Sequence, residues 1–317
     1  MNIQSIPKAE LHCHLDGSIS LSTLQKLLPG RLLTQADVQA PARCRDLAQY
    51  LERFDLPLQG LQTAENLQTA AHDLLIDMHH ESIVYAEIRF APQLHRRQGL
   101  TCQAVIENLL IGLRKAQNQT GGAIRAHLIV CAMRGHTLAQ NQEALRAALA
   151  YRTGIRKDEP GVCGFDLAGD EAAYPLYEFR ELFHAVRAEG LPFTIHAGEC
   201  GSVENVREAA ALGAQRIGHG IALRRDPLLM QQLASEGIGI EMCPTSNLQT
   251  QAIGCWEDYP LQSFLQAGLP VSVHTDNRTV SGTTLTQELE RVYAACPDED
   301  LIRTLIDNAF QTAFAYR

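Results

Sequence analysis

The sequence predicts an α/β protein, a closed (β/α)8 TIM-type barrel with extra helices in its first βα connection. Eight short apolar, β-prone runs recur along the 317 residues, and amphipathic helical patterns separate them. Nearly every run ends in polar residues that can do chemistry, and the C-terminal ends of the strands form the active face of such barrels. No GxGxxG follows the first run, so an open doubly wound sheet is the weaker interpretation.

The eight runs predict the positions of the barrel strands in chain order. We expect strands at residues 9–15, 84–90, 124–133, 162–167, 192–196, 216–219, 239–243 and 269–275. Between them, helical patterns such as residues 103–117 place Val105, Leu109 and Leu113 on one face. No low-complexity stretch or Gly/Ser linker divides the chain, so we expect residues 1–317 to form a single domain.

The first connection, residues 16–82, is far longer than a plain βα unit needs. We therefore expect it to carry extra helices that cover the barrel mouth. Its apolar residues are Leu47, Tyr50, Leu51, Phe54, Leu56, Leu58 and Leu61. Padding of the barrel exterior by these residues is an equally good interpretation, and the sequence leaves both open.

The composition and net charge argue against some classes of binding partner. The formal net charge is −9 and the sequence pI is about 5.7, which argues against broad contact with nucleic acid or an anionic membrane. No apolar run is long enough to cross a bilayer, and no secretory signal is visible. We expect a cytoplasmic protein with a small neutral substrate, and the sequence leaves its oligomeric state open.

Four side chains at predicted strand ends suit a metal ion. His12 and His14 are two positions apart, so both point to the same face of a strand, here toward the barrel axis. His196 and Asp276 follow two later apolar runs and can converge with this pair. Three imidazoles and one carboxylate, with one position open for water, match the preferences of a catalytic zinc ion.

Two further residues are candidates for catalysis. Glu199 lies three residues beyond His196, where a carboxyl group could reach over the metal and shuttle a proton to the substrate. The alternative is that Glu199 caps the following helix. His219 stands between two glycines and could orient or deprotonate a metal-bound water molecule.

Other polar residues in the predicted strands have less specific interpretations. The fourth run contains no lysine that could bridge two ions, so we expect a mononuclear site. His274 shares strand parity with Asp276 and is either a partner of the site or a core histidine. Glu87 and Arg89 share a face, and we expect them to form an interior ion pair that supports the barrel floor.

Seven segments, in order between Pro7 and about Glu288, resemble the adenosine deaminase family: PKAELHCHLDG, YAEIRFAP, VCGFDLAGDE, HAGE, RIGHG, EMCPTSN and HTDN. The resemblance implies deamination of adenosine and 2′-deoxyadenosine by a zinc-activated water molecule. It assigns one zinc ion per chain to four ligands, His12, His14, His196 and Asp276. It further implies that Glu199 protonates purine N1, while His219 and Asp276 hold the water and accept its proton.

The resemblance also implies substrate contacts, which it assigns to His14, Asp16, Gly169 and Asn277. The backbone N–H of Gly169 would meet purine N3, and the carboxylate of Asp16 would contact the ribose. Asn277 departs from the aspartate of animal relatives, although its amide can still donate to N7. His274 stands where asparagine is common in the family.

Several alternative functions remain open on the sequence alone. The protein could deaminate another 6-aminopurine, such as adenine or aminodeoxyfutalosine. More remote alternatives are a metal-dependent phosphoesterase and a catalytically silent nucleoside-binding protein. AMP is a weaker candidate substrate, because no cluster of arginine and lysine is evident for a 5′-phosphate.

Overall fold

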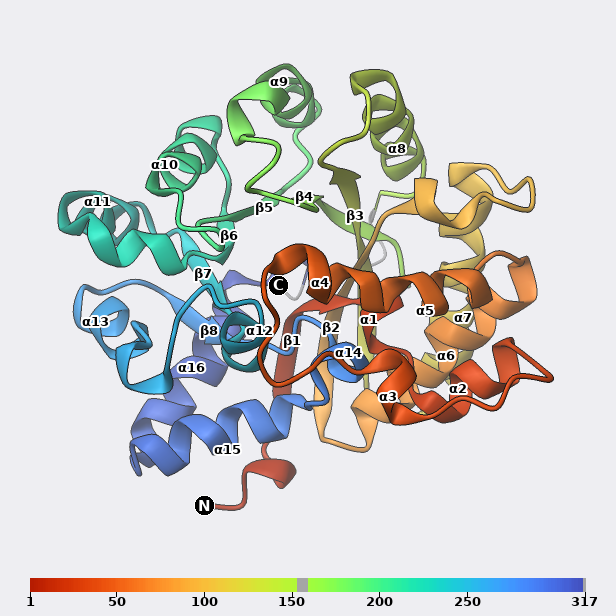
Figure 1. Cartoon of the computed structure of the whole chain (residues 1–317), viewed down its shortest axis with the longest axis horizontal. Helices are drawn as coiled ribbons and strands as arrows, with labels where there is room; N and C mark the ends of the chain where they lie inside the picture. Colours follow the sequence, from red (N-terminus) through yellow and green to blue (C-terminus); the bar gives the residue numbers. More distant parts are fainter. Residues whose placement is uncertain (153–158, 316–317) are drawn as a thin grey trace.

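The computed structural model describes residues 1–152 and 159–315, and in this part of the chain eight parallel strands form the centre of the molecule. The strands are β1 (Lys8–His14), β2 (Ile83–Phe90), β3 (Arg125–Met133), β4 (Val162–Ala168), β5 (Thr194–Ala197), β6 (Arg216–His219), β7 (Gly239–Met242) and β8 (Val271–Val273). Each lies within two residues of its predicted position, and helices surround them in a ring (Figure 1). The predicted (β/α)8 barrel is therefore confirmed.

The barrel is assembled from two four-stranded sheets, β1-β2-β3-β4 and β5-β6-β7-β8. A parallel bridge between Phe165 and Phe193 joins β4 to the start of β5. A second bridge, between Cys13 and Asp276, joins β1 to the end of β8. At this second junction Asp276 donates its backbone N–H to His12 O (2.8 Å) and accepts from His14 N (2.7 Å). The barrel thus closes at the predicted metal-binding residues.

The outer ring consists of helices that bury one apolar face against the strands. Its longest member, α7 (Cys102–Gln119), starts at Thr101, whose hydroxyl accepts from Ala104 N, and buries the predicted stripe that includes Leu109 and Leu113. The other helices of the ring are α8 (Leu138–Ala150), α9 (Arg180–Ala188), α10 (Val203–Leu212), α11 (Pro227–Glu236), α13 (Leu261–Gln266), α15 (Leu285–Ala295) and α16 (Glu299–Thr312).

Short helices occupy the loops around the barrel. They are η1 (Ile3–Ser5), η3 (Pro92–His95), η4 (Leu176–Phe179), η5 (Ile221–Arg225), α12 (Pro244–Gln249), η6 (Trp256–Asp258) and α14 (Arg278–Ser281). Among the described residues, none of the helices combines the length and the apolar character needed to span a bilayer.

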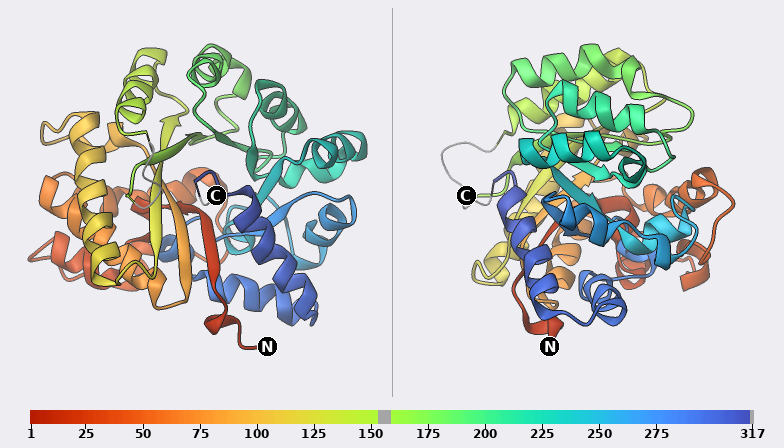
Figure 2. Two further views of the ribbon diagram at one scale, coloured as in Figure 1. Left: turned by 180° about the vertical axis from the view of Figure 1, so that it is seen from behind. Right: turned by 90° about the vertical axis from the view of Figure 1, so that its left-hand side faces the viewer.

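The long connection between β1 and β2 is helical throughout most of its length. It contains α1 (Leu15–Ser18), α2 (Leu21–Leu27), α3 (Gln35–Val38), α4 (Leu47–Leu51), η2 (Glu52–Phe54), α5 (Asp55–Gly60) and α6 (Ala64–His79). Helix α4 crosses in front of the strands, whereas residues 313–315, which follow α16, lie at the opposite end of the barrel (Figures 1 and 2). The insert therefore covers the mouth of the barrel, as predicted.

Candidate functional site

A cavity of about 210 Å³ lies between the C-terminal ends of the strands and the insert. One wall is apolar and comes from the insert residues Leu47, Tyr50, Leu51, Phe54 and Leu58. The opposite side consists of strand ends and the residues that follow them, among which are His14, Ala91, Met133, Ala168, Gly169, His196, His219 and Asp276. The insert residues therefore line the cavity and do not merely pad the barrel exterior.

The structure brings His12, His14, His196 and Asp276 together at the inner end of this region. One ligand atom from each lies within 4.8 Å of the other three. Asp276 Oδ1 is 3.3 Å from His12 Nε2 and 3.4 Å from His14 Nε2, and His14 Nε2 is 3.1 Å from His196 Nε2. Three imidazole nitrogens and a carboxylate oxygen so close together could hold a divalent metal ion.

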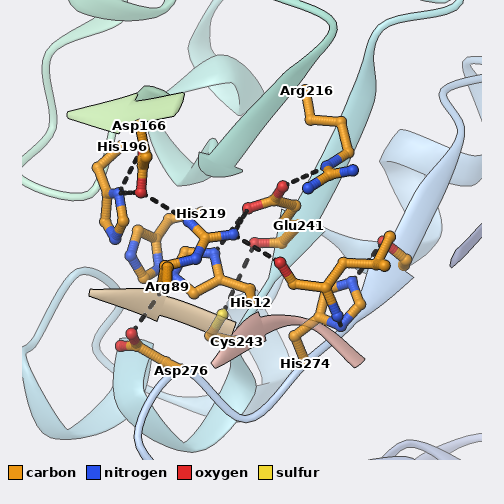
Figure 3. A network of polar contacts seen from close by, with 12 residues as sticks. His12, Arg89, Asp166, His196, Arg216, His219, Glu241, Cys243, His274 and Asp276 are labelled. Atoms are coloured by element: carbon orange, nitrogen blue, oxygen red, sulfur yellow. Dashed lines mark hydrogen bonds and ion pairs between the residues drawn. The ribbon is translucent and has the colours of Figure 1, made fainter. Parts of the chain in front are cut away.

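Buried carboxylates orient two of these imidazoles (Figure 3). Glu241 Oε2 lies 2.8 Å from His12 Nδ1, and Asp166 Oδ2 lies 3.0 Å from His196 Nδ1. Because an ionised carboxylate only accepts, each Nδ1 carries the hydrogen and each Nε2 presents its lone pair to the centre.

The surroundings of His12 Nε2 and Asp276 show that this centre suits a cation. Within the described chain, His12 Nε2 is buried and makes no hydrogen bond. Ser246 donates to Asp276 Oδ2 (2.6 Å) and leaves Oδ1 directed at the histidines. A buried lone pair without a donor and an adjacent free carboxylate oxygen are the environment that a cation requires.

The backbone at the site is held in an unusual conformation. Asp276 has φ 58° and His219 has φ 65°, two of four non-glycine residues with positive φ in the described chain. Such a conformation costs about 1–3 kcal/mol and persists only where surrounding contacts enforce it. At Asp276 the two backbone hydrogen bonds to β1 do so. The hydrogen bonds that join β1 to the end of β8 therefore also orient the Asp276 side chain.

Glu199 lies in the loop after β5 with its side chain buried at the cavity. Thr250 donates to Glu199 Oε1 (3.1 Å), and His219 Nε2 is 3.7 Å from Oε2. Burial, reinforced by the negative charge of Asp276, raises the pKa of Glu199 to about 7. Helix α10 is capped by Ser202 instead, so the capping interpretation of Glu199 is wrong.

His219 faces Glu199 across the cavity, and two residues behind it set its protonation. Tyr259 donates to Asn247 Oδ1 (2.9 Å), which directs the Asn247 amide nitrogen to His219 Nδ1 (3.0 Å). His219 Nδ1 therefore accepts, and the ring hydrogen resides on Nε2 at the cavity. Burial lowers the pKa of His219 to about 3, so the ring is neutral at physiological pH. It can donate to an oxygen but is a poor base.

The remaining predicted contacts, Asp16, Gly169 and Asn277, line the same cavity. Burial raises the pKa of Asp16 to about 6. Gly169 has φ 104°, a conformation that only glycine adopts without strain. Asn277 donates its side-chain N–H to Tyr50 Oη (3.0 Å) on the insert. Of the lining residues described, none is a lysine or an arginine.

The predicted ion pair between Glu87 and Arg89 is wrong. Glu87 and Arg89 are both fully buried, but they do not pair with each other. Arg89 pairs with Asp166 (2.9 Å) and with Glu241 (2.8 Å), and Glu87 pairs with Arg216 (2.6 Å). These partners lie on β4, β6 and β7, none of which pairs with β2, so the ion pairs cross the interior of the barrel.

His274 is a buried core histidine held away from the metal-binding centre. Its Nδ1 lies 2.9 Å from Glu10 Oε1, and its Nε2 lies 2.8 Å from Ser272 Oγ. Glu10 Oε1 also accepts from the backbone N–H of His12 (3.1 Å), so a chain of hydrogen bonds through Glu10 links the His274 side chain to β1.

Several functional neighbours were not identified from the sequence. They are Asp166, Glu241, Asn247 and Thr250. A signal exists for Asp166 and Glu241, because a lone carboxylate inside an apolar strand must be paired when it is buried. Asn247 and Thr250 follow β7 in α12 and the residue after it, where hydroxyl and amide side chains are common and give no such signal.

The fold and the centre together define a barrel hydrolase of the amidohydrolase class. Comparison with known proteins makes the family explicit. The chain belongs to the adenosine deaminase family, whose profile matches residues 7–317.

Relatives of similar length support this membership. The chain is 40% identical to an adenosine deaminase of Enterococcus faecalis over 98% of this chain and 93% of the relative. It is 38% identical to an adenosine deaminase of Lactococcus lactis over 97% of this chain and 90% of the relative.

Solved structures with the same fold include an adenine deaminase from Arthrobacter aurescens and an Arabidopsis N6-mAMP deaminase. The first has a TM-score of 0.85 and 25% identity, with 98% of this chain and 94% of that chain covered. The second has a TM-score of 0.85 and 25% identity, with 99% and 95% covered.

Proposed function

We propose that this protein deaminates adenosine and 2′-deoxyadenosine hydrolytically, giving inosine or 2′-deoxyinosine and ammonia. The observation that carries this proposal is the position of Glu199, an acid with raised pKa, beside a four-residue metal-binding centre in one cavity. The curated relatives named adenosine deaminase at about 40% identity support the choice of reaction.

We propose one zinc ion per chain, held by His12, His14, His196 and Asp276. The donor set of three imidazoles and one carboxylate favours zinc over magnesium or calcium, which prefer oxygen ligands. When bound, the ion would lower the pKa of a water molecule and supply a nucleophile at neutral pH.

Different side chains of the cavity donate and accept the protons of the reaction. Glu199, protonated near neutral pH, donates to purine N1 and makes C6 electrophilic. Asp276, whose pKa the neighbouring histidines hold well below its usual range despite burial, accepts a proton from the attacking water. His219 donates its Nε2 hydrogen to the attacking oxygen and stabilises charge there. Of the two sequence-based alternatives for His219, this favours orientation of the water over its deprotonation.

The substrate contacts follow from the lining of the cavity. We assign the backbone N–H of Gly169 to N3, the Asn277 amide to N7 and the Asp16 carboxylate to the ribose, with His14 beside the substrate. A nucleotide fits poorly, because the described lining of the cavity offers the carboxylates of Asp16 and Asp55 and neither lysine nor arginine for a 5′-phosphate. The partner is therefore a small neutral purine nucleoside.

The remaining assignments are coarser. We treat residues 1–317 as one functional unit, since the family profile spans residues 7–317. We place it in the cytoplasm, because all nine cysteines are free in the structure, as expected in a reducing compartment. The net charge of −9 supports neither nucleic acid nor a membrane as a partner.

A substrate panel on metal-analysed protein tests the proposal. Adenosine, 2′-deoxyadenosine, adenine, aminodeoxyfutalosine and AMP are compared by kcat/KM, with ammonia release as the readout. We expect adenosine and 2′-deoxyadenosine to exceed the others by at least about tenfold, and chelation to abolish turnover until zinc is returned. A preference for adenine by orders of magnitude, or full activity without metal, would refute the assignment.

A further inference from the structure

Glu171 is a buried carboxylate just after β4, outside the residues so far given a role. It is 4% exposed, and it reaches across to the loop that follows β5. Its Oε1 accepts from Gly198 N (2.7 Å) and from the side-chain amide of Asn205 (2.8 Å), and its Oε2 accepts from Cys200 N (2.9 Å). The two backbone donors are the residues immediately before and after Glu199.

This arrangement ties the backbone N–H groups of the two residues that flank Glu199 to a single carboxylate. Asn205 is itself held in place, because its Oδ1 accepts from Leu176 N (3.0 Å). The loop is tightly packed at Gly198. This residue has φ 80°, and a Cβ added to it would lie 2.7 Å from the Val206 side chain. The direction of the Glu199 side chain therefore depends on the carboxylate of Glu171.

We propose that Glu171 is a positioning residue that holds the Glu199 loop in the geometry required for proton donation to the substrate. This inference rests on the proposed function, in which Glu199 is the acid. Among the residues that the structure describes at the cavity and the metal-binding centre, Glu171 is absent, so it acts through the loop that carries Glu199. A misplacement of a reacting group by about 1 Å costs roughly 100-fold in rate.

Glu171 also contributes negative charge to the surroundings of Glu199. The other groups that face Glu199 are Asp276, His196, His219 and the hydroxyl of Thr250. The charges of Asp276 and Glu171 oppose ionisation of Glu199, whereas His196 and the Thr250 hydroxyl favour it. Removing the charge at 171 should thus favour ionisation of Glu199 at lower pH.

Two substitutions separate geometry from charge. Glu171→Gln keeps the volume but has a single acceptor oxygen, so it cannot accept from both Gly198 N and Cys200 N. Glu171→Asp keeps the charge but shortens the side chain by one methylene. Asp170→Asn is the matched control, since Asp170 is the adjacent carboxylate and, among the described residues, its side chain accepts from Ala172 N and Ala173 N and not from the Glu199 loop.

The experiment measures kcat, KM and the pH profile for adenosine, the metal content and the melting temperature of each variant. We expect both Glu171 variants to lower kcat by about 10- to 100-fold with KM within about threefold and metal content unchanged. Glu171→Gln should also move the alkaline limb of the profile to lower pH, whereas Glu171→Asp should leave it in place. Asp170→Asn should match the wild type.

Other outcomes overturn the inference. Wild-type kcat in both Glu171 variants would show that the loop needs no such support. Loss of metal or of folding in step with activity in both variants would make Glu171 merely structural. If the wild type itself fails to release ammonia from adenosine, it is the proposed function that fails, and this is seen before any variant is compared.

Discussion

Two carboxyl groups at the site have pKa values pushed in opposite directions, and this difference divides the chemistry between them. Burial raises the pKa of Glu199 to about 7, so this residue keeps a proton to donate. Burial acts the same way on Asp276, but the surrounding histidines, with His12 Nε2 and His14 Nε2 at 3.3 and 3.4 Å from its Oδ1, outweigh burial and hold the pKa of Asp276 well below its usual range. One group is thereby suited to be the acid and the other the base.

Replacement of the acid tests this division directly. Glu199→Gln keeps the shape and the contact with Thr250 but has no proton to transfer, so we expect kcat to fall by about 10²- to 10⁴-fold while KM changes little. Steady-state kinetics on metal-analysed protein provide the measurement. Near-normal turnover with full metal content would exclude Glu199 as the proton donor.

The pH dependence of activity follows from the same group. In the proposed mechanism the protonated form of Glu199 is the active one. Because its pKa is raised, we expect activity to be present below pH 7 and to be lost as the pH rises through about 7. The alkaline limb of kcat/KM against pH should therefore have an apparent pKa near 7, well above that of an ordinary glutamate. The residual activity of Glu199→Gln should lack this alkaline limb. If the limb persists in the variant, it belongs to another titrating group.

At the residue scale, the sequence predicted the side chains that converge but not their supports. His12 and His14 could be found because strand parity places them on one face, and His196 and Asp276 because they end apolar runs. Asp166 and Glu241 orient two of these histidines from other strands, and Glu171 reaches the Glu199 loop from the end of β4. Such partners depend on strand register, which no local pattern specifies.

Among the elements, helix α4 links the insert to the residues that follow β8 through one side chain. Tyr50 on α4 is 1% exposed, and its hydroxyl accepts from the Asn277 amide (3.0 Å) and lies 2.7 Å from Ser281 Oγ. One N–H of the Asn277 amide is thus committed to Tyr50, and the other remains for the purine. The position of the insert and the orientation of Asn277 are therefore coupled.

Tyr50→Phe should weaken this coupling without opening the apolar wall. The substitution removes the contacts of the hydroxyl with both Asn277 and Ser281. The bond lost by the Asn277 amide is worth about 1 kcal/mol, which corresponds to about a fivefold lower kcat/KM, and we expect most of it in KM. The control is Leu32→Ala, because Leu32 belongs to the same insert but is 91% exposed. Unchanged KM in Tyr50→Phe, or an equal change in Leu32→Ala, would contradict the coupling.

At the element scale, the sequence located the strands well and the insert only in outline. The strands are short apolar runs with polar ends, so their positions follow from local composition. The apolar residues of the insert did not reveal what they cover, because packing on the barrel exterior needs the same side chains. Only the tertiary structure places Leu58 and Phe54 at the cavity and Leu61 in the core.

Across the whole molecule, a buried ionic network joins the metal-binding centre to the far end of the barrel (Figure 3). Glu241 lies 2.8 Å from His12 Nδ1, accepts from Arg89 (2.8 Å) and accepts from Arg216 (2.5 Å). Arg216 continues the network to Glu87. The apolar runs predicted these strands, but the pairing between them arises only when the barrel closes.

Glu241 therefore has two roles that one substitution can expose. Glu241→Gln turns one acceptor into a donor that faces an arginine, so breaking this buried network should lower the free energy of unfolding by about 3–5 kcal/mol. It should also weaken metal binding by about 10- to 100-fold, because the Nδ1 hydrogen of His12 loses a charged acceptor. Denaturant unfolding of the metal-free protein and a competition titration with a chelator measure the two effects separately.

Glu87→Gln is the matched control at the other end of the network. Glu87 pairs with the same Arg216 (2.6 Å) but lies on β2 without contact to a metal-binding histidine among the described residues. We expect it to lower the free energy of unfolding while metal affinity stays within about twofold of wild type, since the orientation of an imidazole depends on its own acceptor. Equal losses of metal affinity in the two variants would mean that Glu241 acts through general stability and not through His12.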